Sequence, residues 1–380
     1  MKRILIFSLA YYPHVGGAEV ALKEITDRIP DAEFHMLTMR FEDEPREEHF
    51  GNITVHRIGR GAGYLSKILF VPRAALCALR LHRERPFDAF WAMMTYMLFP
   101  VVLALALGAR VPYVLTLQDG DPFDRVFGRW YVLPFRPLLA WGFRHAARVQ
   151  AISTYLARWA RAAGFRGAVD VIPNGTDTKM FARTTPHVPE KNSGNVVLVS
   201  TSRLVHKNAL DDIVRALVLL PEHVRFVNYG FGPDARQLEL LARKLGVGAR
   251  VSLLPHPGVP ELPPHLEAAD IFIRPSRSEG MGISFIEAMA AGLPVIATQE
   301  GGIADFLFDA RRNPDKETTG WAVDKNSPEQ IAEAVRDILA HPEQVARVTA
   351  NAKKLAFEKY DWNLIAAQMK KIFDRVFKNR

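Results

Sequence analysis

Short apolar segments alternate with helical stretches along almost the whole chain, and this alternation limits the possible folds more than any other sequence feature. Strands that follow one another in this way pair in parallel, because each helix carries the chain back across the sheet. The sequence up to about Gly164 therefore predicts an open α/β sheet. Its strand candidates are Arg3–Leu9, Glu33–Thr38, Ile53–Arg57, Asp88–Ala92, Tyr113–Leu117 and Arg148–Ile152.

A polar segment with two prolines, Thr184–Asn195, interrupts the alternation without any periodicity, as is typical of a linker. With 380 residues, 48% of them hydrophobic, the chain can bury two cores, since single cores rarely grow beyond about 250 residues. We predict two doubly wound α/β domains, residues 1–183 and 196–358, with residues 184–195 between them. The strand candidates of the second domain are Val196–Ser202, Val224–Gly230, Arg250–Pro255, Asp270–Ser276 and Pro294–Thr298.

A single cysteine, Cys77, excludes a disulfide framework and a cysteine-based metal cluster. It lies in an apolar segment, which favours a buried structural thiol. We therefore expect a cytoplasmic protein.

The net charge of +8 is concentrated in the N-terminal half, where residues 1–170 hold 22 basic and 16 acidic side chains. Residues 57–85 hold seven basic side chains and one acid, Glu84, with Leu65, Ile68, Leu69, Leu76 and Leu79 at helical spacing. This pattern is typical of a helix on an anionic membrane surface. A solvated face on a helix that packs against the core explains it equally well.

The segment Ala89–Ala109 has no charge over 21 residues and is long enough to cross a bilayer. Thr95 and Pro100 divide it, however, and another strand candidate follows it. A strand, a helix and a strand buried in a parallel sheet are just as apolar. We favour that interpretation and expect no membrane span. The start of the chain also lacks a small-residue cleavage site and fits a buried first strand better than a signal peptide.

One carboxylate stands out in the apolar stretch from Gly280 to Gln299, which contains Glu287 as its only ionisable residue. A strand, the loop RSEGMG and a helix that ends at Gly292 place Glu287 in the second helical turn. A buried carboxylate needs hydrogen-bond donors, and the adjacent hydroxyls of a sugar or ribose supply two. The alternative is that Glu287 pairs with a core arginine or caps a neighbouring loop.

Two other loops that follow strands carry groups suited to phosphate. In the second domain, Arg203 and Lys207 precede a helix and can neutralise a diphosphate. In the first domain, Gly16 and Gly17 precede a helix whose first N–H groups can bind an anion, although paired glycines are common in ordinary turns. The start of the helix at Gly280–Ile283 offers N–H groups of the same kind.

The order of the segments SRLVHK, YGFGPD, LPHPG, RPSRSEGMGISFIEAMAAGLPVIAT, EGGIADFL and GWAV closely resembles glycosyltransferase family 4. The resemblance covers essentially the whole chain, including GGAE in the first loop and VIPNGTDTKMF before the linker. It implies a retaining enzyme of the GT-B fold, in which two Rossmann-like domains face each other across a cleft. It also implies that residues 359–380 form a helix that returns to the N-terminal domain.

The resemblance implies a role for each candidate residue. Glu287 would bind the ribose hydroxyls of a nucleotide-sugar donor, and Glu279 would contact the sugar. Arg203 and Lys207 would hold the diphosphate and stabilise the leaving group without a metal or another cofactor, and Gly16 and Gly17 would close over the phosphates. Backbone groups would complete the donor site, at Gly280, Met281, Gly282 and Ile283 for the sugar and phosphate, and at Leu254 and Pro255 for the base.

The sequence departs from the family pattern in two places. Lys207 comes one position earlier than the usual lysine, and Asn208 stands in its place. Gln118 stands before Asp119 where many members carry a histidine. A glutamine cannot take a proton as a general base, although its carbonyl can accept a hydrogen bond. The acceptor contacts that we expect at Gln118, Asp119 and Asp121 therefore remain open.

We expect a retaining hexosyltransferase that uses a UDP- or GDP-sugar and acts on a membrane-borne glycan or lipid in polysaccharide assembly at the cell envelope. One alternative is a nucleotide-sugar 2-epimerase of the same architecture, which needs no acceptor. Another is a non-catalytic protein that binds the nucleotide sugar. The basic residues lack the interleaved aromatic motifs of nucleic-acid binders, so we expect no nucleic-acid partner.

Overall fold

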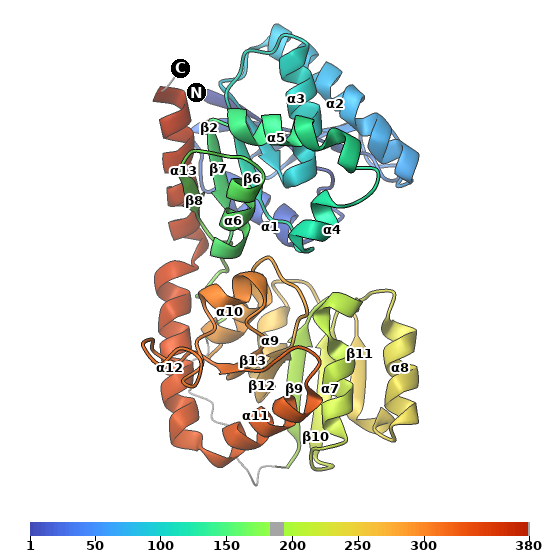
Figure 1. Cartoon of the computed structure of the whole chain (residues 1–380), viewed down its shortest axis with the longest axis vertical. Helices are drawn as coiled ribbons and strands as arrows, with labels where there is room; N and C mark the ends of the chain where they lie inside the picture. The colour runs from blue at the N-terminus through green and yellow to red at the C-terminus, as the bar shows by residue number, and fades with distance from the viewer. Residues whose placement is uncertain (183–193, 379–380) are drawn as a thin grey trace. The chain divides into compact units, whose positions relative to one another are not determined.

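The computed structural model describes residues 1–182 and 194–378 (Figure 1). The chain contacts divide it into two compact units, one formed by Met1–Asn174 with Trp362–Arg380 and the other by Gly175–Asp361. Most of the predicted linker, residues 184–193, lies outside the described residues.

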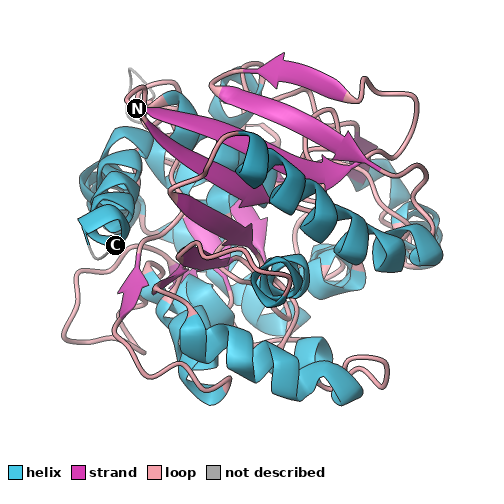
Figure 2. Cartoon of the chain, turned by 90° about the horizontal axis from the view of Figure 1, so that it is seen from above, coloured by secondary structure: helices cyan, strands magenta, loops and turns pink. Residues whose placement is uncertain are grey.

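The first unit contains an eight-stranded sheet in the order β3-β4-β2-β1-β5-β6-β7-β8. All neighbours are parallel except β3 and β4, which Figure 2 shows as two arrows that point in opposite directions at one edge. Every residue of its central strands β5 and β6 is buried, as is typical of a parallel sheet that helices cover on both faces. The strands are β1 (Lys2–Phe7), β2 (Ala32–Met39), β3 (Glu47–Phe50), β4 (Ile53–Ile58), β5 (Ala89–Met93), β6 (Tyr113–Leu117), β7 (Arg148–Ala151) and β8 (Val169–Val171).

The helices of the first unit connect these strands, with one exception from the far end of the chain. They are α1 (Gly17–Asp27), α2 (Tyr64–Glu84), α3 (Leu98–Ala106), α4 (Phe123–Phe127), α5 (Arg136–His145), α6 (Thr154–Ala162) and α13 (Trp362–Lys378). Helix α13 packs beside α1, and the Phe373 ring lies 6.3 Å from Phe34 and 5.1 Å from Trp91. The expected return of the last helix to the N-terminal domain is confirmed (Figure 1).

The second unit contains a parallel six-stranded sheet in the order β11-β10-β9-β12-β13-β14. Its strands are β9 (Val196–Thr201), β10 (Val224–Tyr229), β11 (Val251–Leu254), β12 (Ile271–Arg274), β13 (Val295–Ala297) and β14 (Trp321–Ala322). Its helices are α7 (Leu210–Leu217), α8 (Ala235–Lys244), α9 (Leu262–Glu267), α10 (Ile283–Ala290), α11 (Pro328–Ala340) and α12 (Pro342–Lys359). The sheet order turns back at β9 and β12, and ligands of such sheets bind beyond the carboxyl ends of strands at this point.

The structure confirms both predicted α/β sheets, with small differences at the ends of elements. Ala89–Ala109 forms β5, a short 3-10 turn and α3, as expected, and no helix in the described part of the chain is long and apolar enough to cross a membrane. The expectation that Cys77 is fully buried is wrong, because its side chain is only half-buried. Of the predicted stripe on α2, Leu79 packs into the core, whereas Leu65, Ile68, Leu69 and Leu76 are exposed.

Candidate active site

Helix α10, which follows the loop after β12, carries the most unusual carboxylate of the second unit. Glu287 lies in the second turn of α10 and is only 8% exposed. The hydrogen bonds found among the described residues include none to its side chain. Burial raises the pKa of Glu287 to about 7, although the charge of Arg274 opposes the shift. The side chain is therefore a desolvated acid that has accepting capacity for a ligand.

The alternative that Glu287 pairs with a core arginine is met only in part. Arg274 lies close to Glu287, but it donates its side-chain hydrogen bonds to other residues. Arg274 is the last residue of β12 and is buried. Its Nη2 donates to Oε2 of Glu279 at 2.8 Å, and its Nη1 donates to the Ser284 hydroxyl at 2.9 Å. Burial lowers the pKa of Arg274, and the nearby charges of Glu279 and Glu287 oppose that shift.

Glu279 is held at both carboxylate oxygens by its own loop. Oε2 accepts from Arg274, and Oε1 accepts from the N–H of Gly280 at 3.0 Å. The main-chain oxygen of Glu279 accepts from the N–H of Gly302 at 3.1 Å. A side chain at Gly301, which has a φ of +64°, would lie 1.9 Å from that oxygen, so the EGG segment fits here only with glycine. The loop is thus rigidly built around an orienting ion pair.

Gly282 allows α10 to begin directly above Arg274. It has a φ of +90°, and a Cβ atom there would lie 2.5 Å from Nη2 of Arg274. The helix then starts at Ile283 with no acid in its first turn. The first N–H groups of a helix lack partners within the helix, and its positive end attracts anions. Met281 of this loop is buried, and the contact of the loop with phosphate stays a prediction.

The loop with Arg203 and Lys207 follows β9, which pairs with β12, so the two loops leave the same edge of the sheet. Arg203 is exposed, and its charge contributes to the lowered pKa of Arg274. Asn208, in the place of the usual lysine, is buried and donates its amide to the main-chain oxygen of Arg203 at 2.7 Å. Asn208 therefore shapes the loop, while the half-buried Lys207 lies one residue earlier.

Arg277 ties this loop to the loop of Glu279, which the sequence did not predict. Its main-chain N–H donates to the oxygen of Lys207 at 2.7 Å. Its guanidinium binds both carboxylates at the start of α7, with 2.8 Å from Nη1 to Asp211 and 3.1 Å from Nη2 to Asp212. The structure thus brings the predicted diphosphate residues and the α10 start into one connected assembly.

The predicted base residues lie at the end of the edge strand β11. Leu254 and Pro255 are exposed, and the main-chain oxygen of Leu254 accepts from the N–H of Gly230 at 2.8 Å. Gly230 and Gly232 of the YGFG segment lie against the main chain of Ser202 and Leu204, where a Cβ atom would come within 2.0 and 2.2 Å of a carbonyl oxygen. These contacts link the loop after β10 to the Arg203 loop.

In the first unit, Gly16 caps α1, which begins at Gly17. The Glu19 carboxylate folds back and accepts from the N–H of Gly16 at 2.8 Å. This bond is one half of a capping box, and it places a carboxylate of the helix at its own start, while Gly16 has no side chain for the other half. The two glycines therefore form a structured turn, and their contact with phosphate remains a prediction.

The three expected acceptor residues follow β6. Gln118 is buried and exchanges two hydrogen bonds with Asn174, at 2.9 and 3.2 Å. Asp119 accepts from the Thr95 hydroxyl at 2.9 Å, and burial raises the pKa of Asp119 to about 6. Asp121 is half-buried and pairs with Arg129 at 3.2 Å. Each side chain is thus engaged within the unit, and Gln118 and Asp119 serve at least to fix this loop.

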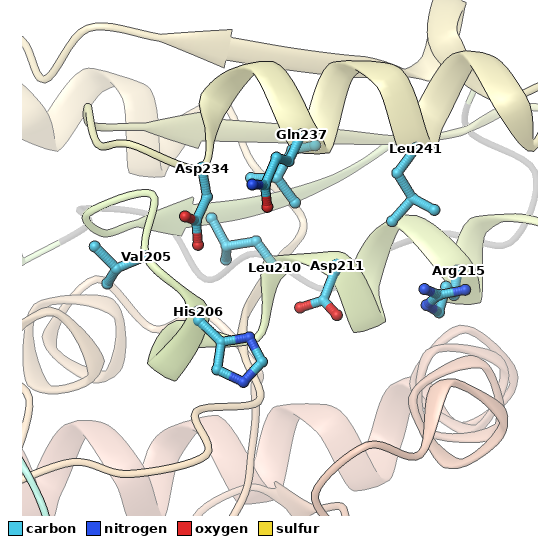
Figure 3. Close-up of a pocket in the computed structure, with 9 residues that line it drawn as sticks. Val205, His206, Leu210, Asp211, Arg215, Asp234, Gln237 and Leu241 are labelled. Atoms are coloured by element: carbon cyan, nitrogen blue, oxygen red, sulfur yellow. The ribbon is translucent and has the colours of Figure 1, made fainter.

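A pocket of about 260 Å³ lies between the start of α7 and α8, beside the Arg203 loop (Figure 3). It contains none of the predicted donor residues. Its walls are Val205, His206, Leu210, Asp211, Arg215, Asp234, Gln237, Leu238 and Leu241. Residues 1–182 and 194–378 also contain no group of three or more His, Cys, Asp or Glu side chains placed to hold a metal ion.

Two family models match consecutive parts of the chain. The model described as Glycosyltransferase Family 4 matches residues 15–180, and the model described as Glycosyl transferases group 1 matches residues 182–355. Among solved structures, sucrose-phosphate synthase from Thermosynechococcus elongatus superposes with a TM-score of 0.85 at 18% identity over all of both chains. Anabaena HepE in complex with UDP-glucose gives 0.79 at 21% identity over 99% of this chain and 100% of that one. The fold is that of the GT-B glycosyltransferases.

Relatives with curated descriptions agree with this class. The chain is 27% identical to the GDP-mannose-dependent alpha-(1-6)-phosphatidylinositol monomannoside mannosyltransferase of Mycobacterium tuberculosis, with 97% of each chain covered. It is 32% identical to the D-inositol 3-phosphate glycosyltransferase of Xylanimonas cellulosilytica, over 74% of this chain and 67% of that relative. The chain belongs to glycosyltransferase family 4.

Proposed function

We propose that this glycosyltransferase transfers a hexose, with mannose from GDP-mannose as the first candidate, to a hydroxyl of a membrane-borne lipid or glycan, with retention and without a metal or other cofactor. The observation that carries the donor part is the buried Glu287 carboxylate beside the start of α10. The M. tuberculosis relative is named as GDP-mannose-dependent and as acting on a phosphatidylinositol mannoside, which supports the choice of donor and acceptor class.

In the proposed reaction the second unit binds the donor. Glu287 accepts from the ribose hydroxyls, Glu279 orients the sugar, and Leu254 and Pro255 border the base. Arg203 and Lys207 bind the diphosphate and stabilise its charge as it leaves. The backbone from Gly280 to Ile283 contributes N–H groups to the sugar and phosphate.

The first unit supplies the acceptor side, with Gln118, Asp119 and Asp121 near the acceptor and Gly16 and Gly17 near the phosphates. The bond between the sugar C1 and the phosphate oxygen breaks while the acceptor oxygen bonds to C1 on the same face. The acceptor proton passes to the departing phosphate oxygen. Gln118 is compatible with this route, because no side chain has to take the proton.

A thermal-shift panel of GDP-mannose, UDP-glucose, ADP-glucose and the free nucleotides tests the donor assignment. The correct sugar nucleotide should raise the melting temperature more than its free nucleotide does. Glu287→Ala should abolish most of this shift, because one carboxylate serves two hydroxyls. The control is Glu222→Ala, which removes an exposed glutamate from the same unit. A normal shift in Glu287→Ala would contradict the ribose assignment.

Product analysis separates this proposal from its alternatives. With GDP-mannose and a phosphatidylinositol glycolipid, the enzyme should release GDP and form a mannosylated lipid with retained anomeric configuration. A 2-epimerase would change the sugar nucleotide without an acceptor, and a binding protein would leave the nucleotide sugar intact.

The exposed face of α2 supports peripheral attachment at the cytoplasmic face of an anionic membrane. Its buried side packs on the core through residues such as Phe70 and Ala78, and its outer side carries large exposed apolar residues. These outer residues, Tyr64, Leu65, Ile68, Leu69 and Leu76, alternate with Lys67, Arg73, Arg80 and Arg83. Near an anionic surface each basic residue contributes about 1 kcal/mol.

A second exposed segment extends this face. The Tyr131 ring contacts the Tyr64 ring at 5.5 Å between centroids and so joins the segment to α2. The sequence between Asp124 and Asp170 contains eight arginines and no acid. Trp side chains prefer the interface between water and lipid, and exposed aromatic residues beside arginines favour insertion there. The large exposed apolar side chains of the segment are Trp130, Leu133, Phe135, Leu138 and Trp141.

Sedimentation with vesicles of phosphatidylcholine and phosphatidylglycerol tests this attachment. We expect binding at low salt that weakens as the salt concentration rises. The double variant Trp130→Ser with Leu65→Ser should bind at least tenfold more weakly. The matched control is Leu240→Ser, which removes an exposed leucine from α8. If the wild type did not bind these vesicles at low salt, the membrane part of the proposal would be wrong.

A further inference from the structure

Arg274 is the charged residue that the sequence pattern of the second sheet does not explain. Strand β12 is otherwise apolar, and all of its residues are buried. A buried arginine is costly unless its donors are bonded, and here Nη1 and Nη2 are bonded, whereas Nε has no partner. Well-packed apolar side chains of similar volume often stabilise a core at least as well as a buried ion pair. The cation is therefore placed for a purpose other than stability.

The guanidinium contacts both Glu279 in the β12–α10 loop and the first turn of α10. It binds Glu279 at 2.8 Å and Ser284 at 2.9 Å, and its centre lies 4.2 Å from the Phe285 ring centroid. Gly282 leaves room for it, because a Cβ atom at that position would meet Nη2. Glu279 of the loop and the first turn of α10 are thus both held by the planar guanidinium group of Arg274.

The charged groups that act on Arg274 are Glu279, Glu287 and Arg203. The cation therefore stands between two acids to which different parts of a nucleotide sugar are assigned. Loss of the guanidinium would affect both acids. Without the guanidinium, Glu279 would lose the partner of its Oε2 atom, and the attraction on the Glu287 carboxylate would vanish.

We propose that Arg274 is a positioning residue for the donor, which holds Glu279 and the start of α10 in the geometry that receives the sugar and its adjacent phosphate. This inference rests on the proposed function, since it assigns Glu279 to the donor sugar. Arg274 acts through Glu279 and Ser284, so it need not touch the donor itself.

A double-mutant cycle between Arg274→Gln and Glu279→Gln tests the inference. The measured quantity is the ratio of the dissociation constants for GDP and GDP-mannose, which isolates the contribution of the sugar. Each single variant should lower this ratio at least tenfold. The double variant should lower it no further, because both changes remove the same oriented carboxylate. Independent, multiplicative losses would overturn the proposal.

Three further measurements separate positioning from general damage. Arg274→Lys keeps the charge but loses the fork that reaches Ser284, so it should restore part of the ratio and folds even if the glutamine variant does not. Without the positive charge of Arg274, the pKa of Glu287 should rise further. As the pH is lowered, GDP binding to Arg274→Gln should therefore begin to decline at a higher pH than in the wild type. Arg250→Gln, which removes an arginine bonded to the carbonyl of Val224 at 2.8 Å, should leave the ratio unchanged.

The outcomes also distinguish the inference from the proposed function. If the wild type bound neither GDP-mannose nor UDP-glucose more tightly than the free nucleotide, the proposed function would fail. If the wild type bound GDP-mannose and Arg274→Gln kept the full ratio with an unchanged pH dependence of GDP binding, only the role of Arg274 would fail. If UDP-glucose is the tighter ligand, the same cycle is measured with UDP and UDP-glucose.

Discussion

Helices α1 and α10 both have a glycine as N-cap residue and carry one acid within their first two turns, but the two acids act in opposite ways. Glu19 folds back onto the N–H of Gly16 and supplies α1 with an internal anion. Glu287 lies one turn further along α10, and no hydrogen bond to it occurs among the described residues. The start of α1 therefore already holds a carboxylate of the helix itself, bonded to the N–H of the N-cap residue, whereas the first turn of α10 contains no acid and suits an external anion.

From the comparison we expect that, in the proposed function, the phosphates of the donor depend more on α10 than on α1. The comparison also explains why the loop before α10 needs an ion pair to hold its shape. Glu279 and Arg274 orient that loop, a task that Glu19 performs alone in α1. Each of the following predictions concerns one of these two helices.

The largest effect is expected for Gly282→Ala. Its φ of +90° disfavours any side chain, and the added Cβ would displace Arg274. We expect a loss of about 3 kcal/mol of unfolding free energy from strain and overpacking together, with loss of GDP-mannose binding, measured by urea denaturation and calorimetry.

Gly292→Ala is the control for that variant. Gly292 lies just beyond the end of the same helix with a φ of +73°, but nothing lies within 4 Å of its added Cβ. It should cost only about 1 kcal/mol, from backbone strain, and keep donor binding. Equal effects of the two alanines would show that the contact with Arg274 is unimportant.

The next effect concerns the pH dependence of stability. Glu287 has a pKa of about 7 in the folded protein against 4.5 for the ordinary group. Between these values the folded state holds a proton that the unfolded state has lost, so the contribution of Glu287 to stability falls as the pH rises from about 4.5 to about 7. Glu287→Gln cannot titrate and does not show this loss. Its free energy of unfolding relative to that of the wild type should therefore be about 2 kcal/mol higher at pH 8 than at pH 5.

Urea denaturation at pH 5 and pH 8 measures this gain, with Glu222→Gln as the exposed control. An equal difference between Glu287→Gln and the wild type at the two pH values would show that Glu287 is not desolvated in the free enzyme. The same variant should bind GDP-mannose weakly, so stability and donor affinity move in opposite directions at this residue.

The smallest effect is expected at α1. Glu19→Ala removes the internal cap and should cost about 1 kcal/mol, visible as faster hydrogen exchange at the amide of Gly16. Glu24→Ala breaks a half-buried pair with Arg28, four residues further along the chain, and should cost about 0.5 kcal/mol. If Glu19→Ala weakened GDP-mannose binding as strongly as Glu287→Ala does, the contrast between the two helix starts would be false.

The sequence predicted the two sheets and the order of the donor loops, because short apolar strands, glycines and helix ends are local signals. It did not predict the edge strand β3, whose residues Glu47–Phe50 include two acids and a histidine. It also did not predict the exposed segment around Trp130, where prolines and aromatic residues show no helical or strand period.

The missing parts of the site are contacts between residues that the sequence alone does not bring together. Gln118 pairs with Asn174 across 56 positions, and Arg277 reaches Asp211 across 66. Arg274 and Glu279 are close in sequence, but their pairing depends on the backbone conformation of Gly282. The sequence did contain one signal for this contact, since Arg274 is the only charged residue of the otherwise apolar strand β12.

The position of α13 determines the order in which the protein can mature during synthesis. Its buried residues, among them Trp362, Met369 and Phe373, complete a core whose other parts were made more than 170 residues earlier. The second unit is contiguous in sequence and is finished first. The N-terminal unit must wait with an open apolar surface until the ribosome releases the last helix, so a chain truncated before Trp362 should aggregate and depend on chaperones.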